Sequence, residues 1–306
     1  MAAALLAAVG AASPAYSEQE ALTAVAYASA VSCADEALLR RWDCTMCRNG
    51  VPPVPAPPSL AQVQVVRSRD GINQGLVGLD APGQRLIVAF RGSVDLSQWI
   101  FDLDVRLVSR YASQGCTQCL VHDGFVSAFE EIGSEVLAAV ASLSNSSGVR
   151  RVLVTGHSLG AAMAVHCALR LAKAEQDFEI VGYTFGQPRV GNRPFAEFAQ
   201  AMLPNWFRVV NYLDPVAQCV KLPGYYHHMA TEVWYFDKPQ PGHTPGRYQV
   251  CSSANGEDDT CQNSRCGGFK LCVDGSNHVS YMNLRDLTDV VTVCGQDHPG
   301  QMLALS

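Results

Sequence analysis

Residues 151–171 read Arg-Val-Leu-Val-Thr-Gly-His-Ser-Leu-Gly-Ala-Ala-Met-Ala-Val-His-Cys-Ala-Leu-Arg-Leu, and they are the most informative part of the sequence about the fold. Its first five residues are a β-branched run that predicts a buried strand, and residues 161–171 are an apolar run long enough for a helix. The G-x-S-x-G pentapeptide between them, Gly156 to Gly160, is typical in that context of a nucleophile elbow, a tight turn with a strained backbone. Glycines lack the side chains that would clash where strand and helix approach each other. Such a turn would raise the hydroxyl of Ser158 into a cleft, at the N-terminus of the following helix.

The overall composition fits one globular α/β domain. The chain has 306 residues, enough for a single large core, and contains neither a long Gly/Ser linker nor an internal repeat that would require a second domain. The formal net charge is -6 at pH 7, which leaves no basic footprint for nucleic acid. We therefore expect no nucleic-acid partner. A monomer is the expected state.

The first residues are a candidate leader sequence. Residues 1–12 are almost wholly Ala, Leu, Val and Gly, and Ser13-Pro14-Ala15 offers the small residues that a signal peptidase reads. This pattern predicts a signal peptide over 1–16, with cleavage near Ala15 or Ser17, and a single domain over 17–306. The missing positive charge leaves an alternative, an alanine-rich helical or disordered start. The run is too short to span a bilayer, so no integral membrane segment is expected.

Twelve cysteines favour an exported, disulfide-bonded protein. Ten of them lie in polar, loop-like or terminal stretches and allow up to five disulfides: Cys33, Cys44, Cys47, Cys116, Cys119, Cys251, Cys261, Cys266, Cys272 and Cys294. The two C-x-x-C pairs at 44–47 and 116–119 leave zinc binding as an alternative. Their separation is far wider than in a zinc ribbon, so we expect no metal. Cys167 and Cys219 lie in apolar stretches and are expected to be buried thiols.

Hydrophobic patterns alternate between strands and helices along the chain. The expected elements are a helix over 18–41, a proline-rich extended connection over 51–59, a hairpin of 63–66 with 75–79, a central strand over 85–90, a helix over 125–143, and strands over 180–185, 207–213 and 231–236. The alternation predicts a parallel-rich sheet with helices on both faces. A glycosylation sequon, Asn145-Ser146-Ser147, is expected in a polar loop before the strand at 151–155.

A serine nucleophile needs a base to take its proton and an acid to orient that base. In the α/β-hydrolase order both follow the serine, the acid first and the histidine later. Asp214 fits the acid because it ends the strand at 207–213, on the carboxyl rim of the sheet where Ser158 is also expected. A simple Asp-Pro turn is the alternative explanation for Asp214. Asp237, which also follows a strand, is the second candidate.

Eight histidines compete for the role of base. His278 comes late in the chain, after a flexible loop at 274–277, and opens a predicted helix over 279–281. Chain order favours it, with support from the family resemblance given below. The other seven precede the serine, lie in the helix after it, or sit in loops and near the C-terminus: His122, His157, His166, His227, His228, His243 and His298.

An ester or amide hydrolase also needs fixed donors for the oxyanion of its tetrahedral intermediate. The backbone N–H of Leu159, directly after the nucleophile, is one expected donor, and Ser93, in the loop after the central strand, supplies the second. The next residues place Leu96, Trp99 and Ile100 on one face of a short helix. That apolar face suggests a lid that opens at a lipid surface. The alternative is a helix buried permanently against the core.

Taken together, these pieces resemble the class 3 lipase family, the fungal secreted lipases and their feruloyl esterase relatives. The segments that carry the resemblance are 90–93 with Trp99, 122–125, 155–160, 186–192 with Phe195, 211–216 and 278–281. The resemblance implies Ser158, Asp214 and His278 as the triad, Ser93 and Leu159 as the oxyanion hole, and a lid near 94–103. It also implies three disulfides, Cys33–Cys294, Cys44–Cys47 and Cys116–Cys119, and leaves the pairing among Cys251, Cys261, Cys266 and Cys272 open.

Three features depart from the family pattern without touching a triad position. Ala161 stands where many members have a second glycine, residues 251–272 are a cysteine-rich insertion, and the proline-rich connection at 51–59 is unusual. The expected activity is that of a secreted serine carboxylester hydrolase on lipid esters at an oil–water interface, with no cofactor. A feruloyl esterase acting on plant cell walls, a phospholipid or galactolipid hydrolase, and a catalytically inactive lipid- or carbohydrate-binding relative are the alternatives.

Overall fold

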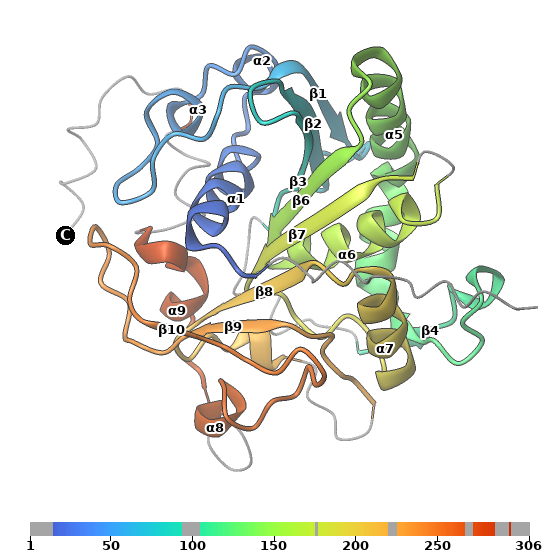
Figure 1. Ribbon diagram of the computed structural model, residues 1–306, viewed down its shortest axis with the longest axis vertical. Helices are drawn as coiled ribbons and strands as arrows, with labels where there is room; N and C mark the ends of the chain where they lie inside the picture. The colour runs from blue at the N-terminus through green and yellow to red at the C-terminus, as the bar shows by residue number, and fades with distance from the viewer. Residues whose placement is uncertain are drawn as a thin grey trace, which may run out of the picture.

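A computed structural model describes residues 15–93, 105–174, 177–219, 225–266, 272–284 and 294. Within these residues the main sheet has eight strands in the order β1-β2-β3-β6-β7-β8-β9-β10 (Figure 1). The strands are β1 Ala61–Arg67, β2 Gln74–Asp80, β3 Arg85–Phe90, β6 Arg151–His157, β7 Glu179–Phe185, β8 Trp206–Asn211, β9 Glu232–Tyr235 and β10 Tyr248–Val250. The pairs from β3 to β9 are parallel, and the pairs at the two edges are antiparallel. The parallel core aligns the carboxyl ends of its strands on one rim.

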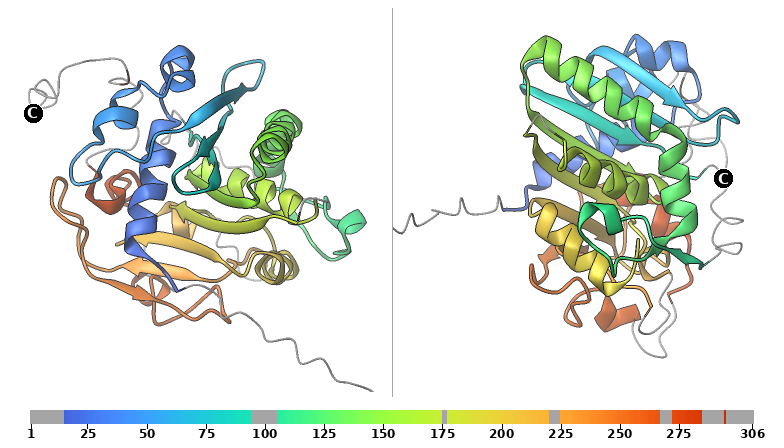
Figure 2. Two further views of the ribbon diagram at one scale, coloured as in Figure 1. Left: turned by 45° about the horizontal axis from the view of Figure 1, so that its top comes forward. Right: turned by 90° about the vertical axis from the view of Figure 1, so that its right-hand side faces the viewer.

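Helices cover both faces of this sheet (Figure 2). On one face lie α1 Glu18–Ala30, α2 Glu36–Arg40, α3 Thr45–Asn49 and the short helix η3 Tyr281–Asn283. On the other lie α5 Asp123–Ser147, α6 Leu159–Leu171 and α7 Arg193–Met202. The remaining elements are β4 Leu107–Val108, η1 Ala112–Gln114, β5 Val121–His122, η2 Val216–Gln218, α8 Asn263–Cys266 and α9 Ser276–Val279. The predicted parallel-rich sheet with helices on both faces is confirmed.

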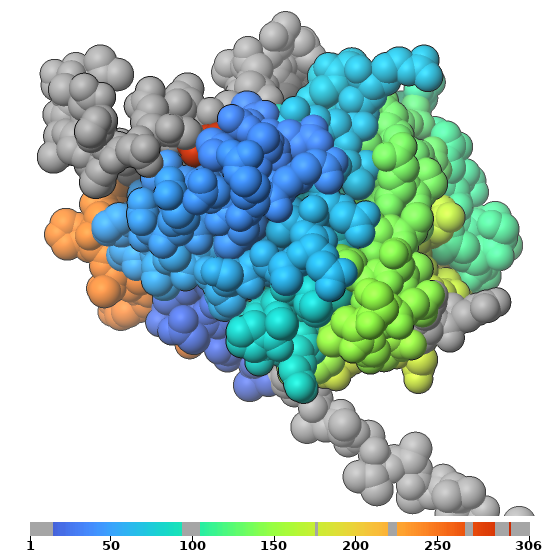
Figure 3. Space-filling model, turned by 90° about the horizontal axis from the view of Figure 1, so that it is seen from above, coloured from blue at the N-terminus to red at the C-terminus, as the bar shows by residue number. Residues whose placement is uncertain are grey.

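Strand β3 shows why the fold needs two apolar layers. Leu86, Val88 and Phe90 enter the core beneath α5 and α6, whereas Ile87 and Ala89 enter the core beneath α1. Successive side chains of a strand point to opposite faces, so a strand between two helical layers is apolar throughout. The β1–β2 hairpin extends this arrangement to the edge, and in Figure 3 it lies between α5 and the N-terminal helices.

Three local expectations from the sequence need correction. The helix expected over 18–41 is two helices, because the chain turns after α1 and Asp35 caps α2 through a bond from the Leu38 N–H to its carboxylate. The sequon residue Asn145 is exposed in the last turn of α5, not in a loop. Strand β8 ends at Asn211, so Asp214 lies beyond the strand on a turn.

Ten cysteines form five disulfides among the described residues, and Cys167 and Cys219 are free thiols. The three pairings implied by the family resemblance are confirmed. The open pairing resolves as Cys251–Cys261 and Cys266–Cys272. Because both C-x-x-C pairs are disulfides, their sulfurs are not zinc ligands. Among the described residues, none of the helices is long and apolar enough to cross a membrane.

A polar pair is embedded in the core between α5, α6 and α7. His166 of α6 is fully buried, and its Nδ1 lies 2.6 Å from the Tyr111 hydroxyl. The aromatic rings of Phe129 and Phe195 pack around the imidazole. Burial lowers the pKa of His166 to about 3, so the ring is neutral in the folded protein near neutral pH.

Because His166 is buried in its neutral form, the free energy of unfolding should fall as the pH is lowered. In His166→Gln this fall should be smaller. The unfolded chain protonates His166 below about pH 6.5, whereas the folded chain resists protonation down to about pH 3. The contribution is therefore complete above pH 6.5 and declines as the pH falls, by at most about 3 kcal/mol at pH 4. Urea unfolding of both proteins at pH 7 and pH 4 measures the difference, and equal pH dependences would contradict the prediction.

Candidate active site

The turn that carries Ser158 has the strained geometry predicted from the sequence. Ser158 lies between β6 and α6 with φ 56° and ψ -123°, a backbone conformation that residues other than glycine rarely adopt. A Cβ on Gly156 would lie 2.4 Å from the carbonyl oxygen of Gly160, and a Cβ on Gly160 would lie 2.3 Å from the carbonyl oxygen of Phe90. Strand, turn and helix are thus in backbone contact, which holds Ser158 in place.

Asp214 and His278 form a buried pair at the same rim. The Nδ1 of His278 lies 3.0 Å from Oδ1 and 2.9 Å from Oδ2 of Asp214, and neither residue is exposed to solvent. Asp214 follows β8, and His278 lies in the short helix α9, 64 residues further along the chain. The bond to Asp214 orients the imidazole and leaves its Nε2 for other chemistry.

The surroundings of Asp214 keep its carboxylate ionised. Burial by itself would raise the pKa of Asp214, but the neighbouring His278 and hydrogen bonds from His278, Tyr281 and the Val216 N–H hold it below the usual value. The Val216 N–H donates to Oδ1 at 2.7 Å, and the Tyr281 hydroxyl donates to Oδ2. Burial and the adjacent carboxylate raise the pKa of Tyr281 well above its usual value, so this hydroxyl keeps its proton and remains a donor.

Two further residues hold the segment that carries His278. The Nε2 of His157 lies 2.7 Å from the backbone carbonyl of His278. Burial, and the nearby His278 ring, lower the pKa of His157 to about 3, so a neutral imidazole donates its Nε2 proton to that carbonyl. Asn211, the last residue of β8, donates its side-chain amide to the carbonyl of Asn277 at 2.8 Å. The last residues of β6 and β8 thus both bind the segment that carries His278.

Close contacts bring the three predicted residues together at one rim. The Ser158 N–H donates to the Phe185 carbonyl at 2.9 Å. The residue after Phe185, Gly186, lies against both Asp214 and His278. A Cβ on Gly186 would lie 2.5 Å from Cε1 of His278 and 2.9 Å from Oδ2 of Asp214. Among the described residues, the buried Oγ of Ser158 and the buried Nε2 of His278 have no hydrogen-bond partner. Polar atoms left in this state are expected where a substrate or water completes the site.

The two expected oxyanion donors flank Ser158. Leu159 opens α6, and the first N–H groups of a helix have no acceptor within it. Ser93 follows Gly92, whose Cβ position would lie 3.4 Å from Cβ of Ser158. The Ser93 Oγ is buried and has no hydrogen-bond partner in the described part of the chain. The expected lid residues Leu96, Trp99 and Ile100 lie outside the described residues.

The other sequence candidates have different partners. Asp237 forms an exposed ion pair with Arg247 at 2.8 Å. His122 caps α5, its Nδ1 accepting from the Phe125 N–H, and Nε2 of His228 donates to the Ala217 carbonyl at 2.7 Å. The Asp-Pro turn considered as an alternative is also present, since the Asp214 carboxylate accepts from the Val216 N–H two residues later. The same carboxylate contacts His278. The sequence reading missed Tyr281, although it lies within the matched segment 278–281.

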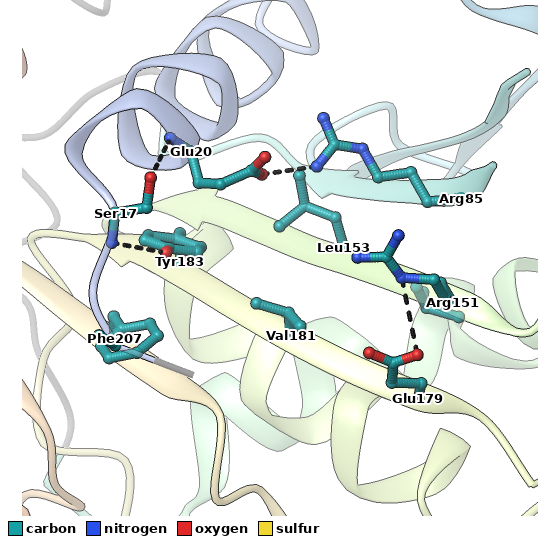
Figure 4. A pocket seen from close by; sticks show the side chains of 11 residues that line it. Ser17, Glu20, Arg85, Arg151, Leu153, Glu179, Val181, Tyr183 and Phe207 are labelled. Carbon is teal, nitrogen blue, oxygen red and sulfur yellow. Dashed lines mark hydrogen bonds and ion pairs between the residues drawn. The ribbon is translucent and has the colours of Figure 1, made fainter. Parts of the chain in front are cut away.

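A separate pocket lies at the opposite end of the sheet (Figure 4). Arg151 and Glu179, which line it, are the first residues of β6 and β7, whereas Ser158 follows the last residue of β6. Its polar groups pair with each other, as in the contacts of Arg85 with Glu20 and of Arg151 with Glu179. This pocket is therefore distinct from the rim that carries Asp214 and His278.

Comparison with known proteins defines the class. Residues 87–223 match the family model described as lipase (class 3), and two solved structures that superpose on this chain are lipases with the α/β-hydrolase fold. The resemblance to the class 3 lipase family, carried by the motifs of the sequence, is confirmed. Its fold is confirmed as the α/β-hydrolase fold.

Particular relatives make the likeness specific. The chain is 31% identical over 218 residues to a secreted mono- and diacylglycerol lipase of Fusarium solani, which covers 71% of this chain and 62% of that protein. The triacylglyceride lipase of Rhizomucor miehei superposes with a TM-score of 0.77 at 27% identity, over 90% of this chain and 98% of that one. A triacylglycerol lipase whose catalytic centre is a serine protease triad superposes with a TM-score of 0.74 at 26% identity, over 89% and 98% of the two chains.

The close fit around Gly186 generates a test of the site geometry. In Gly186→Ala the new methyl group would displace the buried His278 ring, because it would approach Cε1 to 2.5 Å. We expect at least a ~100-fold loss of esterase activity, the scale of a misplacement of about 1 Å. Gly148→Ala is the matched control, since Gly148 also has a positive φ of 74° but open space around its Cβ position. Equal activities in the two variants would contradict the prediction.

Proposed function

We propose that this protein is a secreted carboxylester hydrolase that cleaves acylglycerols, with Ser158, His278 and Asp214 as its catalytic triad. The observation that carries the proposal is the buried Asp214–His278 pair, with a 2.9 Å bond, at the rim where Ser158 sits on its strained turn. The Oγ of Ser158 and Nε2 of His278, which have no hydrogen-bond partner in the described part of the chain, support it, because these are the two atoms that a proton transfer would use.

The proposed mechanism has two symmetric halves. His278 Nε2 takes the proton of Ser158 Oγ as that oxygen attacks the ester carbonyl, and then gives the proton to the departing alcohol. Water follows the same route in reverse and releases the fatty acid from the acyl-enzyme. Asp214 stabilises the imidazolium that forms in each half, and a carboxylate with a lowered pKa stays charged for this role.

The oxyanion of the tetrahedral intermediate would bind two donors, the Leu159 N–H and the Ser93 N–H. The first lies at the N-terminus of α6, where the helix dipole also favours negative charge. The Ser93 hydroxyl would either hold its own loop or add a third donor. Because each fixed donor in such a site contributes a factor of about 10² to 10³ in turnover, both are needed for an efficient enzyme.

The acylglycerol substrate rests on two lines of support. The relatives of this chain described above are lipases of mono-, di- and triacylglycerols. The sequence that follows Ser93 carries Leu96, Trp99 and Ile100 at helical spacing. This is the composition of a lid whose apolar face is covered by the protein while the enzyme is in water and becomes exposed at a lipid surface. A feruloyl esterase is the alternative, since it would use the same triad with a polar, fixed cover.

The wild-type enzyme should hydrolyse tributyrin faster per mole once the ester exceeds its solubility and forms an emulsion. An open lid would expose apolar surface, which costs a free energy of ~25 cal/mol per Å² in water. At a lipid surface the same apolar area is covered by lipid, so this cost is largely removed. Trp99→Ala should weaken this rise more than it weakens hydrolysis of dissolved ester. A rate that saturates through the solubility limit, with preference for methyl ferulate, would favour the feruloyl esterase instead.

Ser158→Ala should abolish the activity on every ester tested, by about 10⁶-fold in turnover, as expected for a triad nucleophile. The measurement is initial rate on a p-nitrophenyl ester with the folded variant, checked by circular dichroism. A variant that keeps a tenth of the wild-type rate, in a preparation free of other esterases, would remove Ser158 as nucleophile and with it the proposed mechanism.

We also propose that secretion removes the leader after Ala15, one residue before the boundary expected from composition. Tyr16 packs into the fold through its hydroxyl and its ring. The hydroxyl oxygen lies 2.8 Å from that of Tyr235, and the ring centroid lies 5.7 Å from that of Phe207 and 5.0 Å from that of Tyr248. Ser17 caps α1, and its N–H donates to the Tyr183 hydroxyl, as Figure 4 shows. Removal of either residue would break these contacts, and the small residues before Tyr16 suit the peptidase.

The protein secreted from a eukaryotic host should therefore begin with Tyr16. N-terminal sequencing and intact mass measure this directly. Tyr16→Ala should lower the thermal midpoint, because it removes an aromatic ring packed in a cluster and a partly buried hydrogen bond between hydroxyls, whereas Thr23→Ala, which removes only a solvent-exposed hydrogen bond within α1, should leave it nearly unchanged. A mature chain that begins at Glu18, or one that keeps the leader, would refute the proposed cleavage site.

A further inference from the structure

Gln262 is a fully buried amide in the cysteine-rich insertion that follows β10. The Cys251–Cys261 disulfide fixes the residue immediately before it. The Gln262 N–H donates to Oε1 of Glu232 on β9 at 3.0 Å, which fixes the backbone of Gln262 itself. A side chain that is long, polar and 0% exposed needs hydrogen-bond partners, because an unsatisfied buried amide is costly.

The partners of this amide all belong to the loop that carries Asp214. Its Nε2 donates to the Asp214 carbonyl at 2.9 Å and lies 3.5 Å from the Tyr212 carbonyl. Its Oε1 accepts from Nε2 of Gln218 at 2.8 Å. One side chain from the insertion therefore binds both ends of the segment from 212 to 218, with Asp214 between them.

This loop requires such support because its backbone is strained. Tyr212 has a φ of 38°, in the left-handed region that disfavours residues other than glycine. Its carbonyl accepts from the indole N–H of Trp234 at 2.8 Å as well as facing Gln262. The strain lets the chain leave β8 and turn so that the Asp214 carboxylate meets His278.

We propose that Gln262 is a positioning residue for Asp214, and that the part of the insertion from 251 to 266 is the support that sets the position of this carboxylate. The proposal rests on the proposed function in one respect, the role of Asp214 as triad acid. Without the two bonds from Gln262, the loop is free to relax at Tyr212, and the Asp214 carboxylate moves relative to His278. A displacement of about 1 Å costs on the order of 10²-fold in rate without any change in the groups that contact substrate.

Gln262→Met is the direct test, because methionine keeps the length of the side chain and removes both polar groups. The matched control is Gln249→Met in β10, directly before the insertion, whose amide donates to the Thr260 hydroxyl at 3.3 Å at the exposed edge. We measure kcat and KM on a soluble p-nitrophenyl ester, and the rate and final extent of labelling by a fluorophosphonate. Gln262→Met should lower kcat by about 10- to 100-fold and leave KM within about twofold. Gln249→Met should behave as wild type.

The labelling separates positioning from a purely structural role. A positioning defect slows labelling but lets every folded molecule react, so the final extent stays at one label per chain. A purely structural role lowers the final extent and leaves the rate constant of the labelled fraction unchanged, and that result would overturn the proposal. Wild-type kcat and labelling rate in Gln262→Met would overturn it as well.

A second variant covers the case in which Gln262→Met does not fold. Gln262→Asn keeps an amide but withdraws it by one methylene, so it cannot reach the Asp214 carbonyl, and it should show the same fall in kcat with unchanged KM. If Gln262→Asn has wild-type kcat, the positioning role is refuted while the proposed function stands. If the wild-type protein is neither labelled at Ser158 nor active on any ester, the proposed function fails and the positioning role fails with it.

Discussion

A single buried negative charge, the carboxylate of Asp214, sets the demands that the rest of the site satisfies. A carboxylate without solvent exposure is stable only if donors replace its water. Three donors are supplied here, by His278, by the Tyr281 hydroxyl and by the Val216 N–H. Two of them come from one short segment near the end of the described chain, so the folding of that segment and the ionisation of Asp214 are coupled.

Distant parts of the chain hold this arrangement together. His157 and Asn211 bind the histidine segment from the ends of β6 and β8, and the Cys33–Cys294 disulfide ties a residue beyond that segment to the end of α1. Each contact joins residues far apart in sequence, so each stabilises the folded state at the cost of a long loop closure. The result is a support that holds Ser158 and His278, whose buried Oγ and Nε2 have no hydrogen-bond partner among the described residues.

Strain is concentrated at two residues of the site, Ser158 and Tyr212, both with positive φ. At Ser158 the strain is held by backbone contact, since neither Gly156 nor Gly160 leaves room for a Cβ. At Tyr212 it is held by side chains, the indole of Trp234 and the amide of Gln262. The two supports differ in origin: the first is built into the pentapeptide itself, whereas the second comes from β9 and from the insertion, both later in the sequence.

The elbow, the alternation of strands and helices and the central apolar strand could be predicted from the sequence, because these follow from local sterics and from side-chain periodicity. Chain order and family motifs also selected Asp214 and His278, which the fold brings into contact. The sequence placed the break after α1, the end of β8 and the sequon wrongly, because capping and tertiary contacts decide where elements stop. Only the tertiary structure brought Tyr281, His157 and Gln262 to the acid and the histidine, since a contact across long stretches of chain leaves no periodic signal in the sequence.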